Sequence, residues 1–567
     1  MFEFKPKLFT SLKNYSKATF ASDLMAGIIV GIVALPLAIA FGIASGVSPE
    51  QGILTAIIAG LIISLFGGST VQIGGPTGAF IVIIYGIIQQ YDISGLIVAT
   101  LIAGVMLVVM GLFKLGTIIK FIPYPIIVGF TSGIAVTIFT TQMADAFGLS
   151  FGDAEIPGDF VGKWILYFKH INTIDPWNAL ISIVSVLLIA ITPRFSKKIP
   201  GSLIAIIVMT LVGYFLKEYL SISTIATIGD KFDISTKIPP LKVPNISWDM
   251  IRDLFPVAGV IAVLGAIESL LSAAVADGVT GDKHNSNTEL IAQGIANMIT
   301  PLFGGIPATG AIARTMTNIN NGGKTPVAGI IHAVVLLLIF LFLMPLAKFI
   351  PMACLAGVLI VVSYNMSGWR TFKALMKNPK SDVAVLLTTF FLTVIFDLVV
   401  AIQFGLLLAA LLFMKRVAET TKVSVNKDKI ELTEDLGPAF KDEEIDIPHG
   451  VEVYEIDGPF FFGIANRFEE LMITLKDRPM VRILRMRKVP FIDSTGIQNL
   501  TSLCRTSHRQ HIIIVLSGVT PSVHETLQKA GFNDIIKDEN ICHDIYEAID
   551  RSKDILAENK FNSSNKS

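Results

Sequence analysis

The stretch that decides the fold is Gly304-Gly305-Ile306-Pro307-Ala308-Thr309-Gly310-Ala311-Ile312-Ala313-Arg314, which lies between apolar segments long enough to cross a bilayer. An earlier stretch has the same character: Gly67-Gly68-Ser69-Thr70-Val71-Gln72-Ile73-Gly74-Gly75-Pro76-Thr77-Gly78-Ala79. Irregular backbone survives in hydrocarbon only where it is buried in protein or lines a cavity, because unpaired N–H and C=O groups are costly there. Two such breaks in corresponding halves of a membrane protein indicate a ligand site between them.

The composition divides the chain into two parts. Of the 567 residues, 52% are hydrophobic and 16% are charged, whereas soluble domains carry about 25% charged residues. Between Leu24 and Phe113 the only charged residues are Glu50 and Asp92, and the sequence becomes charge-rich after Phe413. This pattern predicts a polytopic α-helical membrane domain followed by a soluble domain. The formal net charge of +0 argues against a nucleic-acid partner.

The membrane domain is expected to cover residues 1–417, with repeats at about 20–217 and 250–417. Apolar spans fall at 24–43, 49–66, 76–90, 94–113, 121–143, 176–193 and 199–216, then at 254–274, 288–303, 308–319, 325–347, 351–366, 382–396 and 398–414. Seven spans in each repeat predict 14 transmembrane segments in a 7+7 inverted repeat, because an odd number reverses the entry side of the second repeat. The third span of each set is short, so both are interpreted as half-helices that begin near the membrane midplane.

The charges in the loops test this topology. With the N-terminus inside, the cytoplasmic loops hold Lys114, Lys120, Arg194, Lys197, Lys198, Arg370, Lys373, Lys377, Lys380, Lys415 and Arg416, and the acidic 145–160 loop falls outside. The positive-inside rule therefore predicts a multi-pass protein of the cell (inner) membrane with both termini cytoplasmic. A count of twelve segments would place the termini in the same way.

The C-terminal part alternates strands and helices. Residues 418–448 are interpreted as a charged linker, 449–555 as a small α/β domain, and 556–567 as a disordered tail. Within the α/β domain, strands are expected at 451–456, 460–462, 481–486 and 511–516, and helices at 465–475 and 521–529. The three cysteines, Cys354, Cys504 and Cys542, have no disulfide or metal spacing.

The two half-helices can form an anion site. A helix N-terminus exposes unpaired N–H groups and about half a positive charge, and two such ends aimed at one spot attract an anion. The expected contacts are Gly75, Thr77, Gly78, Ala79, Thr309, Gly310 and Ala311, with the two threonines as hydroxyl donors. Arg314 lies one turn into the second half-helix and would add its charge. The alternatives are glycines that only allow close helix packing, and an arginine that snorkels or pairs with Glu268.

A coupling ion is expected next to this site. Glu268 is the only ionisable residue between Leu254 and Ala276, and Ser272 follows one turn later on the same helix face. A desolvated carboxylate can carry a proton, or it can bind Na⁺ together with a hydroxyl and backbone carbonyls such as those of Gly310 and Ile312. The alternative is a structural ion pair with Arg314. The sequence has no phosphate loop, metal cluster or nucleophile triad, so no enzyme and no cofactor other than Na⁺ is expected.

At these residues the chain resembles the SulP family of inorganic-anion transporters, the bacterial relatives of the animal sulfate/chloride/bicarbonate carriers and prestin. The resemblance covers nearly the whole chain and rests on Ala34-Leu35-Pro36-Leu37-Ala38-Ile39-Ala40, Gln72-Ile73-Gly74-Gly75-Pro76-Thr77-Gly78-Ala79, Gly265-Ala266-Ile267-Glu268-Ser269-Leu270-Leu271-Ser272, Gly304-Gly305-Ile306-Pro307 and the run Asn318–Thr325. It implies a core and a gate domain that move in elevator fashion, usually in a homodimer, with the anion between the third and tenth helices.

The resemblance also implies roles for single residues. Glu268 matches the family's intramembrane acid, which binds Na⁺ with a hydroxyl one turn later in cyanobacterial bicarbonate carriers and is linked to protons in plant sulfate carriers. Here that hydroxyl is Ser272, so the coupling ion stays open. Arg314 matches the arginine beside the anion site of the animal members. Leu37 replaces a glutamine that many animal members have, so their selectivity does not transfer to this chain.

The C-terminal domain resembles a STAS domain, the fold of anti-sigma-factor antagonists, through Asp457-Gly458-Pro459-Phe460-Phe461-Phe462-Gly463 and Asp493-Ser494-Thr495-Gly496. Thr495 occupies the position of a serine that is phosphorylated in the antagonists, and a cytoplasmic protein partner would bind this domain. The favoured alternative is that Asp493 or Ser494 only caps the next helix.

Three functions are compatible with this sequence. The first is secondary active uptake of an inorganic anion, with sulfate or bicarbonate favoured, coupled to Na⁺ or H⁺. The second is an uncoupled exchanger or channel, and helix ends with one arginine also suit chloride or a C4-dicarboxylate. The third is a membrane-anchored signalling protein that acts through the STAS domain, which would not need a polar midplane.

Overall fold

The computed structural model describes residues 4–564 except 118–122, 153, 155, 196–199, 238, 242–243, 245–246, 397, 421, 428, 432–443 and 462–478. The chain divides into two compact units, Met1–Ala409 and Ala410–Ser567, and each is described by itself.

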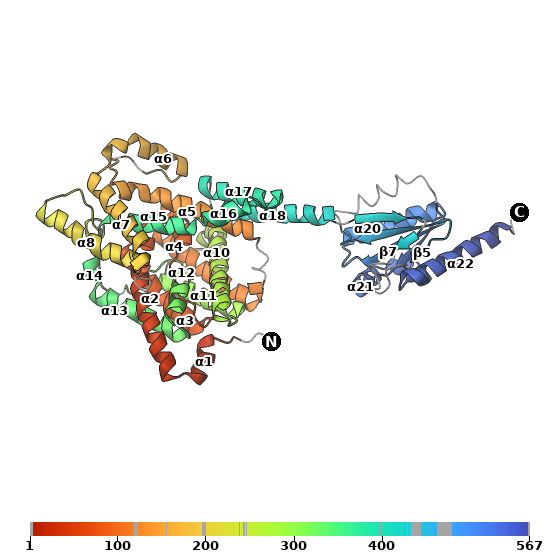
Figure 1. The fold of residues 1–567 in the computed structure, drawn as a ribbon, viewed down its shortest axis with the longest axis horizontal. Coiled ribbons are helices and arrows are strands. Elements are labelled where there is room, and N and C mark those ends of the chain that lie inside the picture. Colours follow the sequence, from red (N-terminus) through yellow and green to blue (C-terminus); the bar gives the residue numbers. More distant parts are fainter. Residues whose placement is uncertain are drawn as a thin grey trace. The chain divides into compact units, whose positions relative to one another are not determined.

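The first unit is built of helices (Figure 1). The helices of the first repeat are α2 (Lys17–Ala44), α3 (Pro49–Phe66), the short η2 (Gly78–Phe80) that continues into α4 (Ile81–Leu112), α5 (Tyr124–Phe147), α7 (Pro176–Phe195) and α8 (Gly201–Tyr219). Those of the second are α10 (Trp248–Thr280), α11 (Ser286–Ile299), α12 (Ile312–Asn320), α13 (Pro326–Phe342), α15 (Met352–Met366), α17 (Lys380–Ile395) and α18 (Leu398–Thr420). In the described part of the chain, 8 helices are long and apolar enough to cross a membrane, and α13 is a shorter apolar helix.

Short helices lie in the segments between these elements. They are α1 (Lys7–Ser11), α6 (Phe160–Lys169), α9 (Ile228–Lys231), α14 (Met344–Ala347) and α16 (Trp369–Leu375). The α6 helix lies in the connection between α5 and α7, which the sequence predicts to be external. Its N-terminus is capped by Asp159, whose carboxylate accepts a hydrogen bond from the Gly162 N–H at 2.6 Å.

The spans predicted at 76–90 and 94–113 correspond to two helical stretches that meet at a kink at Asp92. η2 and α4 run from Gly78 to Leu112, but Asp92 has φ 58° and ψ −173° inside α4. A residue in this conformation interrupts the helical hydrogen-bond ladder. The chain therefore changes direction at Asp92, and the first half of α4 is the predicted half-helix.

The helices of the first unit form two packed groups. In the first group α4 packs on α10 and α11, and α13 packs on α2 and α3. In the second group α5 packs on α7, α15 and α17, and α7 packs on α8. Each repeat contributes its first four helical elements to the first group, so the two glycine-rich breaks belong to one packed body.

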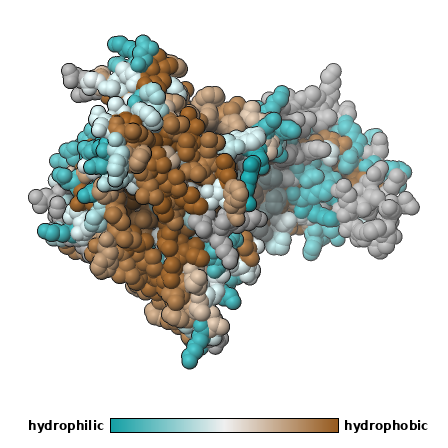
Figure 2. Space-filling model, turned by 60° about the vertical axis from the view of Figure 1, so that its left-hand side comes forward, coloured by the Kyte–Doolittle hydropathy of each residue, from teal (hydrophilic) through white to brown (hydrophobic). Residues whose placement is uncertain are grey.

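The surface of the first unit is apolar over a broad area, as Figure 2 shows for one face. On α7 and α8, large hydrophobic side chains such as Leu180, Leu187 and Leu211 are at least half exposed. Exposed apolar patches of this kind are rare in soluble proteins and are the rule where a protein faces lipid. The structure therefore agrees with a helical, polytopic membrane domain.

The second unit is an α/β domain. Its sheet has the order β3-β6-β7-β8-β9, formed by β3 (Lys422–Asn426), β6 (Val451–Asp457), β7 (Val481–Lys488), β8 (Ile513–Ser517) and β9 (Ile541–Cys542). β3 is antiparallel to β6 and the remaining pairs are parallel. The helices are α20 (Ser494–Arg509), α21 (Pro521–Lys529) and α22 (Ile545–Ser564). The side chains of β7 are buried along most of the strand, as expected for a sheet covered on both faces.

Two predicted boundaries in this unit need correction. The segment 418–448 is predicted as a linker, but it contributes β3 to the sheet and a separate hairpin of β4 (Lys429–Glu431) with β5 (Glu444–Asp446). The strand forms there because Val423 and Val425 pack on the core of the domain while charged residues flank them. The tail predicted as disordered from 556 continues α22 to Ser564. The helix predicted at 465–475 lies outside the described residues.

Candidate functional site

The two glycine-rich breaks meet in the centre of the first unit. β1 (Gly74–Gly75) and β2 (Thr309–Gly310) form an antiparallel ladder in which Gly74 faces Gly310 and Gly75 faces Thr309. All four residues are buried. The backbone leaves the helical conformation here, inside the membrane domain. Its buried N–H and C=O groups need hydrogen-bond partners, and the ladder supplies them.

Each ladder glycine lies where a side chain would collide with its surroundings. A Cβ atom at Gly310 would lie 1.5 Å from Nε2 of Gln72 and 3.2 Å from the Cα of Ser269. A Cβ atom at Gly75, where φ is 152°, would lie 2.2 Å from Nη1 of Arg314. These two glycines therefore let the side chains of Gln72 and Arg314 approach the backbone directly. This role differs from the close helix packing that was the alternative explanation for the glycines.

Arg314 is buried beside the ladder, with 2% of its surface exposed. Its Nη2 donates a hydrogen bond to the backbone oxygen of Pro76 at 3.1 Å, and no described group accepts a hydrogen bond from Nη1. Within the described residues, no ion pair joins Arg314 to Glu268. The guanidinium thus links the two breaks and keeps donor capacity, whereas the snorkelling alternative requires an exposed charge.

Glu268 faces the first break from α10. The Thr77 hydroxyl donates to Oε2 of Glu268 at 2.8 Å. One turn along α10, the Ser272 hydroxyl donates to Oγ1 of Thr315 at 3.2 Å, and this oxygen also accepts the N–H of Ile73 at 3.1 Å. A carboxylate and three hydroxyl oxygens therefore gather around one turn of α10, a donor set of the hard oxygen type that small cations prefer.

The two threonine hydroxyls differ from the sequence expectation. Thr77 and Thr309 are predicted to donate to the anion, but Thr77 donates to Glu268 and Thr309 donates to the Gly265 carbonyl at 2.8 Å. Both hydroxyl protons are therefore used inside the protein. The donors that remain for a ligand are the backbone N–H groups of the two helix starts and the Arg314 guanidinium.

The remaining predicted residues lie at the two helix starts. Gly78 is the first residue of η2, and a Cβ atom there would lie 2.8 Å from Sδ of Met366, at the end of α15 in the second helix group. Ala79 follows it and is fully buried. Ala311 donates its N–H to the Ile73 carbonyl at 2.8 Å, and Ile312 opens α12 with 42% of its surface exposed. The site is therefore built by the first helix group and touched by the second at Gly78.

Sequence reasoning missed the side chains that hold the breaks in place. Glu289 in α11 accepts the N–H of Gly68 at 2.8 Å and the Gln293 amide at 2.9 Å. Asn297 donates to the Ala308 carbonyl at 2.8 Å and accepts the Ala308 N–H at 2.9 Å. The spacing of four residues places Glu289, Gln293 and Asn297 on one helix face, and this polar face in an apolar span was a readable signal. One helix thereby fixes both breaks.

A further polar contact ties the first break to α10. The Gln72 amide donates to the backbone oxygen of Ser269 at 3.1 Å and to its hydroxyl oxygen at 3.0 Å. In the sequence Gln72 is a single polar residue inside a glycine-rich run, so nothing in the local pattern identifies its partner.

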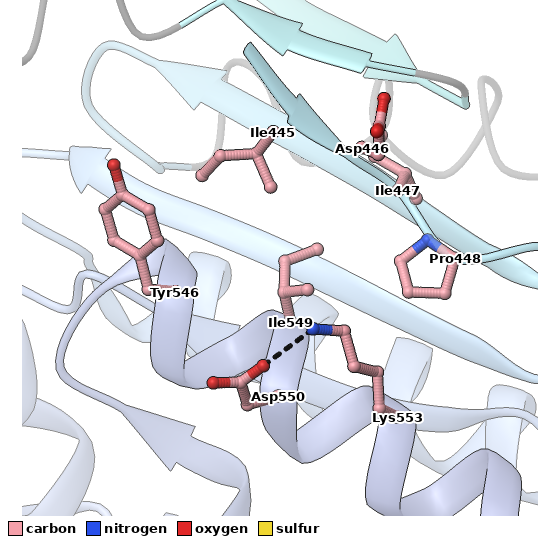
Figure 3. A pocket seen from close by; sticks show the side chains of 8 residues that line it. All are labelled: Ile445, Asp446, Ile447, Pro448, Tyr546, Ile549, Asp550 and Lys553. Carbon is pink, nitrogen blue, oxygen red and sulfur yellow. Dashed lines mark hydrogen bonds and ion pairs between the residues drawn. The ribbon is translucent and has the colours of Figure 1, made fainter. Parts of the chain in front are cut away.

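In the second unit, Thr495 is exposed in the first turn of α20. The Asp493 carboxylate accepts the N–H of Gly496 at 2.7 Å and caps the helix, as the favoured alternative expects. A cavity of about 480 Å³ lies between β5 and α22 (Figure 3). At its edge Lys553 pairs with Asp550 at 2.8 Å, and Asp446 adds a second carboxylate to the lining. This cavity lacks the buried unpaired donor that distinguishes the site in the first unit.

The geometry favours reversible binding of charged solutes. Two helix N-termini and a guanidinium attract negative charge, and the Glu268 carboxylate attracts a cation or a proton beside it. Within the described residues there is no cluster of metal-ligating side chains. The arrangement offers a place for an anion next to a place for a cation, both inside a membrane domain.

Comparison with known proteins gives a consistent result. Residues 20–389 match the profile of the Sulfate permease family, and residues 444–549 match the STAS domain. The putative sulfate transporter YvdB of Bacillus subtilis is 42% identical over 522 residues, which cover 92% of this chain and 95% of that protein. The bicarbonate transporter BicA of Picosynechococcus is 30% identical over 517 residues, covering 88% of this chain and 89% of that protein.

Solved structures show the same architecture. The transmembrane domain of a cyanobacterial bicarbonate transporter BicA superimposes with a TM-score of 0.60 at 30% identity, covering 70% of this chain and 98% of that chain. The murine anion transporter Slc26a9 in the inward-facing state gives a TM-score of 0.85, covering 96% of this chain and 93% of that chain. Its 19% identity supports the fold alone.

Proposed function

Because this chain belongs to the sulfate permease family, we propose that it is a secondary active transporter of an inorganic anion, with sulfate and bicarbonate as the first candidates. The observation that carries the proposal is the buried Arg314, which bridges the two breaks through Pro76 and keeps Nη1 without a partner among the described groups. A buried guanidinium with spare donors is stabilised by a negative ligand. The named relatives transport sulfate or bicarbonate, and both anions suit this donor set.

Coupling to a cation is the second part of the proposal. Glu268 and Ser272 lie on one face of α10, and Thr77 connects the carboxylate to the helix start that would bind the anion. A bound Na⁺, or a proton on Glu268, offsets the negative charge that the anion brings into a low-dielectric interior. The carbonyls of Gly310 and Ile312 are proposed to complete a Na⁺ site. Sodium is then a transported co-substrate and not a resident cofactor.

We also propose that access alternates by an elevator movement. The residues of the site come from the first helix group, and the second group reaches it at Gly78 through Met366. A site carried on one packed body can move relative to the other without being dismantled. Fourteen crossings, cytoplasmic termini in the inner membrane, a homodimer and a cytoplasmic protein partner at the STAS domain belong to the same proposal, with Thr495 as a candidate modification site.

The test is uptake by the full-length protein reconstituted into liposomes. Radiolabelled sulfate, bicarbonate, chloride and a C4-dicarboxylate are supplied with and without a Na⁺ gradient and a pH gradient. The proposal expects uptake of sulfate or bicarbonate that depends on one cation gradient and is lost in Arg314→Ala and Glu268→Gln. Arg252→Ala is the matched control, because this arginine is exposed near the start of α10.

The outcomes separate the alternatives. Anion flux that ignores both gradients would show an exchanger or a channel. Uptake of the C4-dicarboxylate alone would change the substrate class. Full uptake by Arg314→Ala would contradict the anion site, and no flux of any anion in wild-type protein would favour a signalling role for the STAS domain.

A further inference from the structure

A buried lysine lies on the predicted external side of the membrane domain. Lys163 is on α6, in the connection between α5 and α7, and only 6% of its surface is exposed. Its Nζ donates to the backbone oxygen of Gly158 at 3.0 Å and lies 5.5 Å from the ring centre of Tyr85. Within the described residues no carboxylate lies within ion-pair distance of Lys163; Asp159, which caps the helix at Gly162, attracts it from farther away. Desolvation by burial lowers the pKa of Lys163, and the attraction of Asp159 opposes this shift only in part.

Lys163 lines two neighbouring cavities of about 330 and 310 Å³. Both are also lined by Ala44, Tyr85 and Thr141, so they meet at the lysine. In the second cavity the other charges are Asp145 and Lys231, which form an ion pair at 2.7 Å. Lys163 is therefore the cation without a carboxylate partner among the described residues that line these cavities.

The first cavity leads from this lysine towards the candidate site. Along α4 its lining extends from Ile81 to Tyr91 and includes Tyr85, Gln89 and Gln90. Ile81 follows directly on η2, the helix start that contains Gly78 and Ala79. Tyr85 lies seven residues after Gly78, which corresponds to about 10 Å along a helix. The cavity thus runs along α4 from the first helix start to the turn at Asp92.

The opposite wall comes largely from other elements. Thr137 and Thr141 on α5 contribute hydroxyl groups one turn apart, and Val257 and Phe396 close the remaining side. Since α4 belongs to the first helix group and α5 to the second, the cavity lies between the two bodies that the elevator proposal moves.

We propose that Lys163 is a second anion contact, placed at the external mouth of the route to the Arg314 site, where it attracts an inorganic oxyanion before the carrier takes it up. This inference rests on the proposed transport function and adds an entry site to it. A desolvated ammonium at the end of a narrow cavity raises the local concentration of anions, and electrostatic focusing of this kind speeds their capture. The side-chain amides of Gln89 and Gln90 along the wall replace water around the anion on its way inward.

The test compares two lysines of one helix in intact cells that express the full-length protein. Lys163→Gln removes the buried charge, and Lys169→Gln removes an exposed charge from the same helix. Initial rates of uptake are measured for radiolabelled sulfate, and separately for bicarbonate, over a range of external concentrations. We expect Lys163→Gln to raise KM about fivefold with little change in maximal rate, Lys169→Gln to match wild type, and Lys163→Arg to restore most of the affinity.

A second measurement separates charge from structure. Of the native cysteines, Cys354 lies in α15, and Cys504 and Cys542 lie in the second unit, so Lys163→Cys introduces a thiol on the predicted external side, where a methanethiosulfonate reagent is applied. A cationic reagent should restore the affinity, and an anionic reagent should weaken it further. Equal effects of the two reagents, or equal KM values for Lys163→Gln and Lys169→Gln, would overturn the proposal.

The Arg314 variant keeps this result distinct from the proposed function. If Arg314→Ala abolishes uptake while Lys163→Gln behaves as wild type, the result contradicts the entry site and supports the proposed transport function. If Arg314→Ala transports normally, or wild type takes up neither anion, the proposed function fails and the entry site falls with it.

Discussion

The two glycine-rich breaks look alike in sequence, but the structure gives them unequal tasks. The first, 67–79, contains no charged side chain and leads into α4, whose helix is interrupted at Asp92. The second, 304–314, ends in a buried arginine inside α12, a helix of nine residues. The charged residues of the candidate site also come from one side, because Glu268 and Arg314 both belong to the second repeat. The two repeats thus share a backbone architecture, but only the second supplies the charged side chains of the candidate site.

The breaks also differ in what holds them. The first is fixed by second-repeat helices, through Ser269 on α10 and Glu289 on α11, and through Asn318 on α12, whose amide donates to the Val71 carbonyl at 2.8 Å. The second is fixed partly by the first repeat, since the Thr55 hydroxyl on α3 accepts the Ile306 N–H at 2.8 Å. Each repeat therefore positions the break of the other, and the site exists only when both are folded together.

The largest effect is expected where the two breaks touch. Gly310→Ala places a methyl carbon on Nε2 of Gln72 and close to the Cα of Ser269, so the Gln72 amide must give up its hydrogen bonds to Ser269 and the ladder must shift against α10. We expect transport to fall about 100-fold, since displacing reactive geometry by about 1 Å has effects of this size. Initial-rate uptake by purified protein of matched amount measures it.

Gly278→Ala is the control for this substitution. Gly278 lies near the end of α10, and a Cβ atom there would meet nothing within 4 Å. This variant should transport as wild type does and unfold at the same temperature or slightly higher, because alanine is the better helix former. Normal transport by Gly310→Ala would show that the ladder is dispensable and that the breaks need not meet so closely.

The next effect concerns the charge that only the second break carries. In Arg314→Lys the positive charge stays, but the planar group that reaches Pro76 and also presents a free Nη1 is lost. We expect the KM for the transported anion to rise about tenfold, with the protein still folded. Competition by unlabelled anion in an equilibrium binding assay measures the change, and an unaltered affinity would mean that bulk charge alone suffices.

The sequence was sufficient to predict several of these features for physical reasons. Glycine and proline inside apolar spans indicate broken helices. A lone arginine or glutamate in such a span indicates a site, because burying a charge in a membrane costs free energy that a structural position does not recover. The helical membrane domain and the position of Glu268 and Arg314 beside the first break followed from this, and the alternation of strands and helices predicted the α/β domain. The pairing of β1 with β2 was expected only as proximity.

The remaining features depend on partners that sequence spacing does not name. The hydroxyls of Thr77 and Thr309 donate within the protein because Glu268 and the Gly265 carbonyl lie nearer than any ligand. The sequence did not predict strand β3. Its five residues lie in a charged segment, and an alternation of apolar and polar residues this short does not indicate a strand. Contacts between residues far apart in the chain decided these cases.

A smaller effect is expected on stability, and it again differs between the breaks. Asn297→Ala leaves both backbone groups of Ala308 without their side-chain partner, and each unsatisfied buried group costs about 1–3 kcal/mol. Gln72→Ala removes a donor from Ser269, whose carbonyl already belongs to α10, so its cost is nearer to about 1 kcal/mol. The unfolding temperature in detergent should therefore be lower for Asn297→Ala than for Gln72→Ala. The reverse order would mean that the contact that holds the first break contributes more to stability.

The smallest effect separates the two threonines that start from equivalent positions. Thr309→Val removes one hydrogen bond to a helix carbonyl and should cost about 1 kcal/mol of stability while the KM values for anion and cation stay the same. Thr77→Val frees Glu268 from its donor, so we expect the cation concentration for half-maximal uptake to shift about threefold, with a loss of stability at least as large as that of Thr309→Val. Uptake at varied Na⁺ and at varied pH, with thermal unfolding of the same samples, distinguishes the two results. If Thr309→Val shifted the cation dependence and Thr77→Val did not, the second break would hold the coupling ion as well as the charge, and the first would serve only as its support.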